Sequence, residues 1–60
     1  MKSKPVRFKF ALEQKVQTPF DNMGIVAMQA VDAGGVHYFI QMEKSLCWYR
    51  ESQLRAWESN

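Results

Sequence analysis

The feature that most constrains this chain is a set of short segments with a two-residue repeat, each ended by residues that favour turns. The clearest segment is residues 36–43, which would place Tyr38, Ile40 and Met42 on one side of a strand. Successive side chains of a strand point to opposite faces, so this period is typical of a half-buried strand. Residues 32–35 (Asp-Ala-Gly-Gly) come just before it, and glycines in that position favour a hairpin turn. The pattern therefore predicts antiparallel β-structure.

Similar segments occur along the whole chain and predict an all-β protein with no helix longer than two turns. The strands are expected at residues 6–10, 14–18, 24–32, 36–43, 46–49 and 54–57, with one 3₁₀ turn at residues 50–53. Strands this short leave many exposed edges, and closure into a small barrel protects them. The inward-facing set would be Val16, Val26, Tyr38, Ile40, Tyr49 and Leu54.

With 60 residues, the chain can form one domain that buries only about 60% of its unfolded surface. Residues 1–5 are expected to be a basic, flexible lead-in, residues 6–58 the domain, and residues 59–60 a tail. Cys47 is the only cysteine, so no disulfide within the chain can add stability. Hydrophobic residues make up 47% of the chain, more than one small core can enclose. Association with another molecule would cover the surplus.

The sequence offers no catalytic or cofactor site, and we expect no enzyme activity, cofactor or small-molecule substrate. Cys47 and His37 are the only soft metal ligands, whereas a structural zinc site needs four ligands. Both fall in predicted strands, and a single strand cysteine is usually a small buried hydrophobe. Gly34 and Gly35 precede a strand, whereas a phosphate-binding loop needs a helix after it. Without an apolar span or signal core, and with one thiol, we expect a cytoplasmic protein and no membrane contact.

Positive charge is concentrated near the N-terminus. The net charge of the chain is only +2, but residues 1–15 contain five basic residues and one acidic residue. The basic residues are Lys2, Lys4, Arg7, Lys9 and Lys15. Alternating with Phe8 and Phe10, they could follow a phosphate backbone, which makes nucleic-acid binding one functional hypothesis. Lysines on an edge strand also protect against aggregation, so a solvated edge explains the same pattern.

Aromatic residues give the second hypothesis. If Tyr38 points inward, Phe39 must point outward, and Trp48 and Tyr49 are related in the same way. Exposed aromatic rings dominate protein contacts, so we expect a protein-contact surface formed by Phe39 and Trp48 with His37 and Gln41. The partner would be a second copy of the chain, in a dimer or tetramer, or another protein. Aromatics partly buried at the rim of the core are the simpler explanation.

The order of several short motifs resembles SH3-like barrels of small bacterial and phage proteins. These motifs are Val-Gln-Thr-Pro-Phe at residues 16–20, Gly-Ile-Val at 24–26, Tyr-Phe-Ile at 38–40, and Trp-Tyr at 48–49 followed by Leu54. The resemblance covers roughly residues 10–57 and implies a barrel of five to six short antiparallel strands. It implies little about function, because such barrels bind nucleic acids, peptides or other subunits.

One group of enzymes is distantly similar. Plasmid-encoded type II dihydrofolate reductases are SH3-like barrels that form a tetramer around a central pore, and their functional segment reads Val-Gln-Ile-Tyr. The matching residues here are Leu46, Cys47, Trp48 and Tyr49, so only the tyrosine is kept, and Thr18 lies where a functional lysine is expected. The reductase activity is therefore not carried over. The leading hypothesis is a self-associating protein-interaction module, and the alternative is a nucleic-acid-binding accessory protein.

Overall fold

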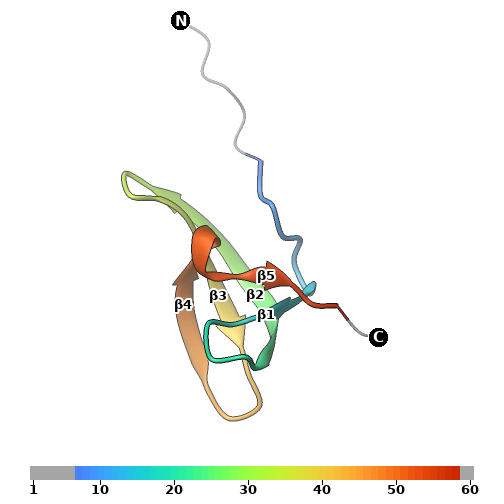
Figure 1. Ribbon diagram of the computed structural model, residues 1–60. Coiled ribbons are helices and arrows are strands. Elements are labelled where there is room, and N and C mark those ends of the chain that lie inside the picture. The colour runs from blue at the N-terminus through green and yellow to red at the C-terminus, as the bar shows by residue number, and fades with distance from the viewer. Residues whose placement is uncertain (1–6, 59–60) are drawn as a thin grey trace, which may run out of the picture.

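The computed structural model describes residues 7–58, which form five antiparallel strands in one sheet (Figure 1). The elements in chain order are β1 (Lys15–Gln17), β2 (Met23–Asp32), β3 (Gly35–Gln41), β4 (Leu46–Arg50), the 3₁₀ turn η1 (Glu51–Gln53) and β5 (Arg55–Ala56). The all-β prediction is confirmed, and these elements agree with the expected boundaries to within two residues. The lead-in at residues 1–5 and the tail at 59–60 lie outside the described residues. In the described part, no helix is long and apolar enough to cross a membrane.

The β2–β3 hairpin is closed by the turn that the sequence predicts. Asp32 pairs with Gly35, and the Asp32 carboxylate accepts a hydrogen bond of 2.7 Å from the Gly34 backbone N–H. Gly35 has a φ of 113°, a conformation that side chains larger than hydrogen make costly. The hairpin is therefore fixed by one acidic side chain and one glycine.

Strand β2 connects the two halves of the sheet. Its first residues, from Met23 to Ile25, pair with β1, and the stretch from Ile25 to Asp32 pairs with β3. The β2–β3 register shifts between Val26 and Met28, which marks a β-bulge. A bulge bends its strand and increases the local twist, so β2 can serve both halves.

The hydrogen-bonded sheet does not close into the expected barrel. Its strand order is β4-β3-β2-β1-β5, so β4 and β5 are the two edges. After β4 the chain turns through η1, where the Leu54 N–H donates to the Glu51 carbonyl, and β5 then pairs with β1. This turn directs β5 across to β1 (Figure 1), and the ladder stays open between the two edges.

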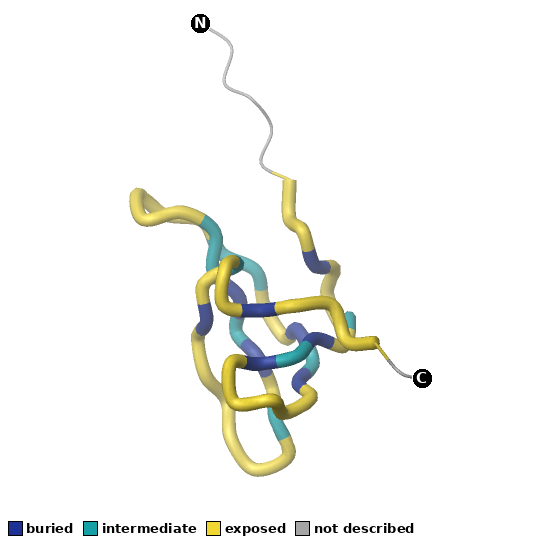
Figure 2. Tube along the Cα trace, viewed as in Figure 1, coloured by how far each residue is buried: buried dark blue, intermediate teal, exposed yellow. Residues whose placement is uncertain are grey.

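The core lies where the alternating pattern predicts it. All six expected core residues are buried, with at most 9% of the surface of any of them exposed. Phe10 and Thr18 are buried as well, and Val36 and Met42 pack against the cluster. Figure 2 shows buried positions alternating with partly buried ones along the central strands. The inward and outward assignment of β3 and β4 is therefore correct.

The strand expected at residues 6–10 is absent from the described part, which begins at Arg7. The Lys9 N–H donates to Glu51 Oε2 at 3.1 Å, and the Phe10 N–H donates to the Tyr38 hydroxyl at 3.2 Å. Because side chains satisfy these groups, the segment needs no strand partner.

The two phenylalanines of this segment differ in burial, although both alternate with the basic residues in the sequence. The Phe10 ring packs edge-on against Tyr38 at a centroid distance of 5.3 Å, and its carbonyl accepts a bond of 2.8 Å from Gln29 Nε2. Phe8 remains 37% exposed. The segment is therefore anchored at one ring.

Candidate functional site

The outward aromatic residues meet as a cross-strand pair. Phe39 on β3 lies opposite Trp48 on β4, and their rings stack with centroids 4.8 Å apart and planes inclined by 27°. Trp48 is 52% exposed, although tryptophan is among the largest apolar side chains. The inward neighbours of this pair are Tyr38 and Tyr49, which belong to the core. The stack therefore lies on the opposite face of the sheet from the core.

Local hydrogen bonding explains why the two rings are so close. The Met42 N–H donates to the Ser45 carbonyl, so this pair is hydrogen-bonded at the end of the β3–β4 ladder. Hydrogen-bonded and non-hydrogen-bonded pairs alternate along an antiparallel ladder. Phe39 and Trp48 are three pairs further along, which makes them a non-hydrogen-bonded pair. Side chains approach each other most closely in such pairs.

The stack is the centre of a larger surface, which we call the outer face. Cross-strand partners point to the same side of a sheet, so each row of paired residues in β2, β3 and β4 can be followed across. The rows are Ile25–Gln41–Leu46, Met28–Phe39–Trp48 and Ala30–His37–Arg50. Met28 is 46% exposed and Leu46 is 52% exposed. Met28, Trp48 and Leu46, with half-buried Phe39 between the first two, thus form an apolar stripe across three strands.

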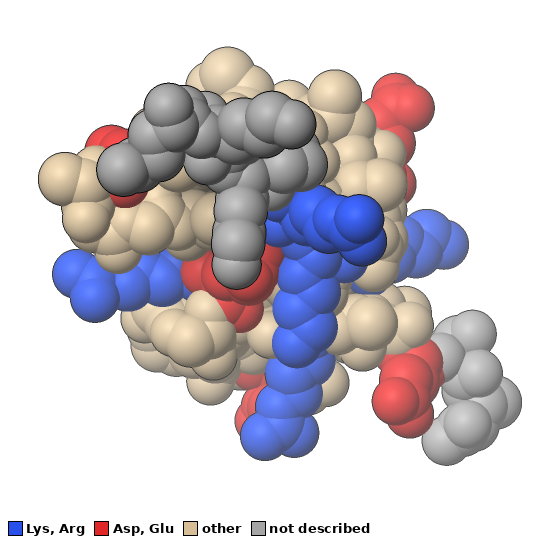
Figure 3. All heavy atoms as spheres, turned by 90° about the horizontal axis from the view of Figure 1, so that it is seen from above, with Lys and Arg blue, Asp and Glu red and all other residues tan. Residues whose placement is uncertain are grey.

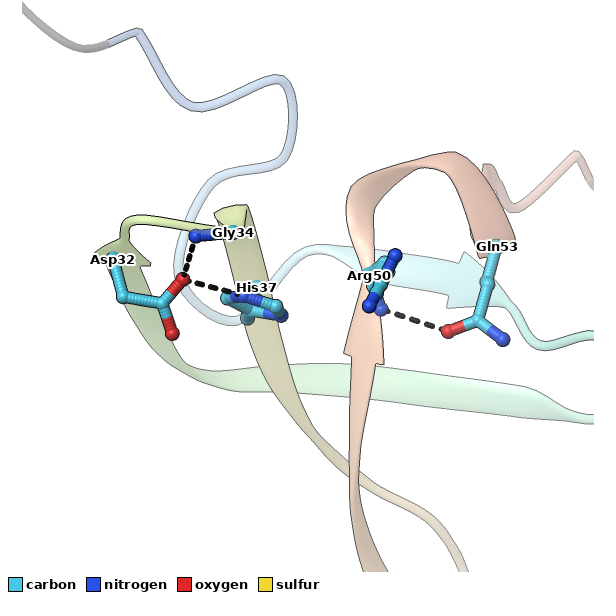
Figure 4. Close-up of polar contacts among 5 residues, drawn as sticks. All are labelled: Asp32, Gly34, His37, Arg50 and Gln53. Atoms are coloured by element: carbon cyan, nitrogen blue, oxygen red, sulfur yellow. Dashed lines mark hydrogen bonds and ion pairs between the residues drawn. The ribbon is translucent and has the colours of Figure 1, made fainter.

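Polar groups border one end of the outer face (Figure 4). His37 Nε2 lies 3.0 Å from Asp32 Oδ1, the same oxygen that accepts the Gly34 N–H. The Gly34 N–H is the main cause, and His37 the next, of an Asp32 pKa below its usual value. The contribution of this carboxylate to stability is therefore present at neutral pH and is lost as the pH falls through its lowered pKa. Arg50, opposite His37, adds positive charge at this end.

The structure brings together the four residues expected to form a protein contact. His37, Phe39 and Gln41 follow one another on the outer face of β3, and Trp48 lies beside them on β4. The sequence prediction missed Met28 and Leu46. Leu46 could have been predicted, because it is two residues before Trp48 and must point to the same face of the strand. Met28 carries no such signal, because the bulge after Val26 changes the alternation of β2.

The basic residues of the alternative hypothesis are not brought together in the same way. Lys2 and Lys4 lie outside the described residues, while Arg7, Lys9 and Lys15 are exposed. Arg7 and Lys9 are not in a strand, and Lys9 Nζ lies 5.6 Å from the centre of the Phe10 ring. Seen from above, basic and acidic side chains lie next to one another (Figure 3). Acidic side chains thus border the basic ones on this side.

Groups that could support catalysis or metal binding are spread over the molecule. Within residues 7–58, no cluster of three or more His, Cys, Asp or Glu side chains could hold a metal ion. Cys47 is exposed and lies opposite Ile40, on the core side of the sheet, whereas His37 belongs to the outer face. These two residues therefore do not form a nucleophile–base pair.

Comparison with known proteins finds no matching family model, no matching curated protein and no matching solved structure.

Proposed function

We propose that this chain is a non-enzymatic protein-interaction module that associates with itself through the outer face. The observation that carries this proposal is the stacked pair of half-buried Phe39 and exposed Trp48, in the row that starts at exposed Met28. Contiguous apolar patches rimmed by polar groups mark contact surfaces. Tryptophan at the centre of such a patch is the residue most enriched in binding hot spots.

Energetic considerations favour this use of the surface. A domain of 60 residues has a small core, and the described part contains neither a disulfide nor a metal cluster to support it. Removing apolar surface from water contributes about 25 cal/mol for each Å². Association through Trp48, Met28 and Leu46 would therefore stabilise the fold as well as the complex.

We further propose that the sheet is an SH3-like barrel left open between its two edge strands. Four observations support this assignment. Strands β2, β3 and β4 form a meander, a single 3₁₀ turn follows β4, and β5 returns to pair with β1. The bulge at the middle of β2 provides the bend that such a barrel needs. An experimental structure with two packed half-sheets would support the assignment, and a flat sheet would exclude it.

The test of self-association is sedimentation equilibrium of the whole chain from low micromolar to millimolar concentration. We expect a dimer or tetramer whose formation is unchanged or strengthened by added salt, because apolar contacts do not weaken as salt is raised. A monomer over the whole range would overturn the proposal. The outer face would then be better explained as the contact for a different protein.

The same protein also tests the alternative, nucleic-acid binding through the basic N-terminal residues. Binding of a fluorescent oligonucleotide would be measured at increasing salt, since contacts with phosphates weaken steeply as salt is added. Salt-sensitive binding that is lost when Arg7, Lys9 and Lys15 are replaced by glutamine would favour the alternative. Binding that is weak at every salt concentration is expected from the proposed function.

A further inference from the structure

The outer edge of β4 is unpaired among the described residues. Strand β4 pairs only with β3, and Figure 1 shows it at the border of the sheet with no described segment beyond it. The Met42–Ser45 hydrogen bond determines which backbone groups face outward. Cys47 and Tyr49 bond to β3, so the N–H and C=O groups of Leu46, Trp48 and Arg50 point away from the sheet.

A second hydrogen bond confirms which backbone groups of β4 point away from the sheet. The Arg50 N–H donates to Gln53 Oε1 at 2.9 Å, so it points away from β3 and is already satisfied by η1 (Figure 4). No described hydrogen bond is made by the outward groups of Leu46 and Trp48. The open part of the edge is therefore the short stretch from Leu46 to Trp48.

We infer that a second copy of this chain pairs with this edge, β4 against β4 and antiparallel, about a two-fold axis at Cys47. The inference rests on the self-association proposed above and places its contact at the β4 edge of the outer face, where Leu46 and Trp48 lie, and not over the whole face. Leu46 of each copy then lies opposite Trp48 of the other, and each such pair exchanges two N–H···O=C bonds. The open donors and acceptors complement one another under this symmetry, as an isologous contact requires. The Gln53–Arg50 hydrogen bond stays intact.

The exposed apolar side chains of this edge fit the same arrangement. Leu46 and Trp48 are each 52% exposed and lie on the outer face, so every Trp48 ring gains a leucine neighbour from the other copy. The edge from Leu46 to Arg50 has only one charged side chain, Arg50. Antiparallel pairing separates the two copies of Arg50. In this register Lys44 of one copy lies opposite Arg50 of the other, and Glu43 lies opposite Glu51. These like-charge pairs oppose the contact, and added salt should weaken their repulsion.

Cys47 provides a probe of this geometry because it is exposed and would lie on the symmetry axis. Its backbone groups bond to β3, so the two Cys47 residues would form a non-hydrogen-bonded pair with Cα atoms about 4.5 Å apart. That separation is within the range that a disulfide can span. An axis at Trp48 would place the two Cys47 residues diagonally, about 7–8 Å apart. A face-to-face dimer would hold Cys47 on the far side of each sheet.

The experiment is oxidation of the whole chain with diamide at a concentration where sedimentation shows association, read on a non-reducing gel. We expect rapid conversion to a disulfide-linked dimer. The matched control carries Cys47→Ser with Ser45→Cys, which moves the thiol along the same exposed edge to a position opposite Tyr49 of the other copy. This control is expected to cross-link only slowly. Circular dichroism would verify that both proteins are folded.

A third variant tests the backbone bonds themselves. Leu46→Pro removes an outward N–H at the first residue of β4, a position where proline is tolerated because β3 does not use that group. We expect it to slow the cross-linking of Cys47 while leaving the circular dichroism spectrum unchanged. If wild type and the Ser45→Cys control cross-link equally slowly, the edge pairing is overturned. If wild type then still associates in sedimentation, the proposed self-association stands but its geometry is different. If wild type is a monomer, both the self-association and the edge pairing are overturned.

Discussion

Tyr38 and Glu51 are joined by a hydrogen bond of 2.5 Å, which the phenol hydroxyl on β3 donates to the carboxylate at the start of η1. The same carboxylate oxygen accepts the Lys9 N–H, and the Tyr38 hydroxyl accepts the Phe10 N–H. Two side chains therefore connect the central strand, the 3₁₀ turn and the N-terminal segment. The tyrosine belongs to the buried core, so this connection forms part of the packing and not only of the surface.

The first prediction concerns this connection. Tyr38→Phe preserves the ring but leaves the buried Phe10 N–H without an acceptor, which should reduce the free energy of unfolding by about 1–3 kcal/mol. Urea denaturation followed by tryptophan fluorescence would measure the change. Glu51→Gln is the matched control, because its amide oxygen can still accept both bonds and its effect should be smaller. Equal stability of Tyr38→Phe and wild type would show that water satisfies the Phe10 N–H.

The second prediction concerns alkaline pH. Burial is the main cause that raises the pKa of both Tyr38 and Tyr49 above the ordinary value of 10.0, and the bond to Glu51 raises that of Tyr38 further. A raised pKa means that the folded state holds the phenol proton more tightly than the unfolded state. The stabilisation is complete below pH 10.0 and is lost as the pH rises through the raised pKa values.

Thermal unfolding between pH 8 and pH 12 would measure this loss. We expect a flat melting temperature at first and a decline above about pH 10, the ordinary pKa of tyrosine. Tyr38→Phe should decline less steeply, since one of the two buried phenols is removed. An identical decline in both proteins would assign the effect to other groups.

The third prediction concerns a close approach in the sheet. A methyl group at Gly24 would lie 2.3 Å from Cγ2 of Ile40, a fully buried side chain. Gly24→Ala should therefore destabilise the fold by about 1–3 kcal/mol through overpacking. Gly34→Ala is the matched control, because its nearest neighbour is an exposed Asp32 oxygen at 3.2 Å. Differential scanning calorimetry would compare them, and equal melting temperatures would show that Ile40 moves aside freely.

Much of the fold follows from the alternating pattern, because one face of each central strand must be buried. The pattern placed Tyr38 and Ile40 inside and Phe39 and Trp48 outside, as the structure has them. It failed at residues 6–10, where side chains rather than a neighbouring strand satisfy the backbone. Such long-range bonds, between residues up to 42 positions apart, leave no local signal.

The sequence predicted some residues of the outer face but not all of them. Phe39 and Trp48 follow from the period of two, but their direct stacking depends on the register between β3 and β4. Met28 could not be assigned, because the bulge in β2 moves it to the outer face. Whether the ladder closes depends on how η1 directs the chain after β4, which a period of two does not specify.

The last prediction tests the outer face in solution. Trp48→Ser removes the most exposed ring of the stack, and because this residue is 52% exposed the fold itself should be little affected. We expect the variant to sediment as a monomer with a melting temperature that no longer depends on protein concentration. In wild type the melting temperature should rise with concentration, because association stabilises only the folded state.

Phe20→Ser is the matched control for this variant. Phe20 is 72% exposed and lies in the turn between β1 and β2, outside the rows that define the outer face. Its loss removes a comparable exposed aromatic ring and should leave the oligomeric state unchanged. If Phe20→Ser dissociates the protein while Trp48→Ser does not, the contact surface is at the β1–β2 turn, and the outer face is free for another partner.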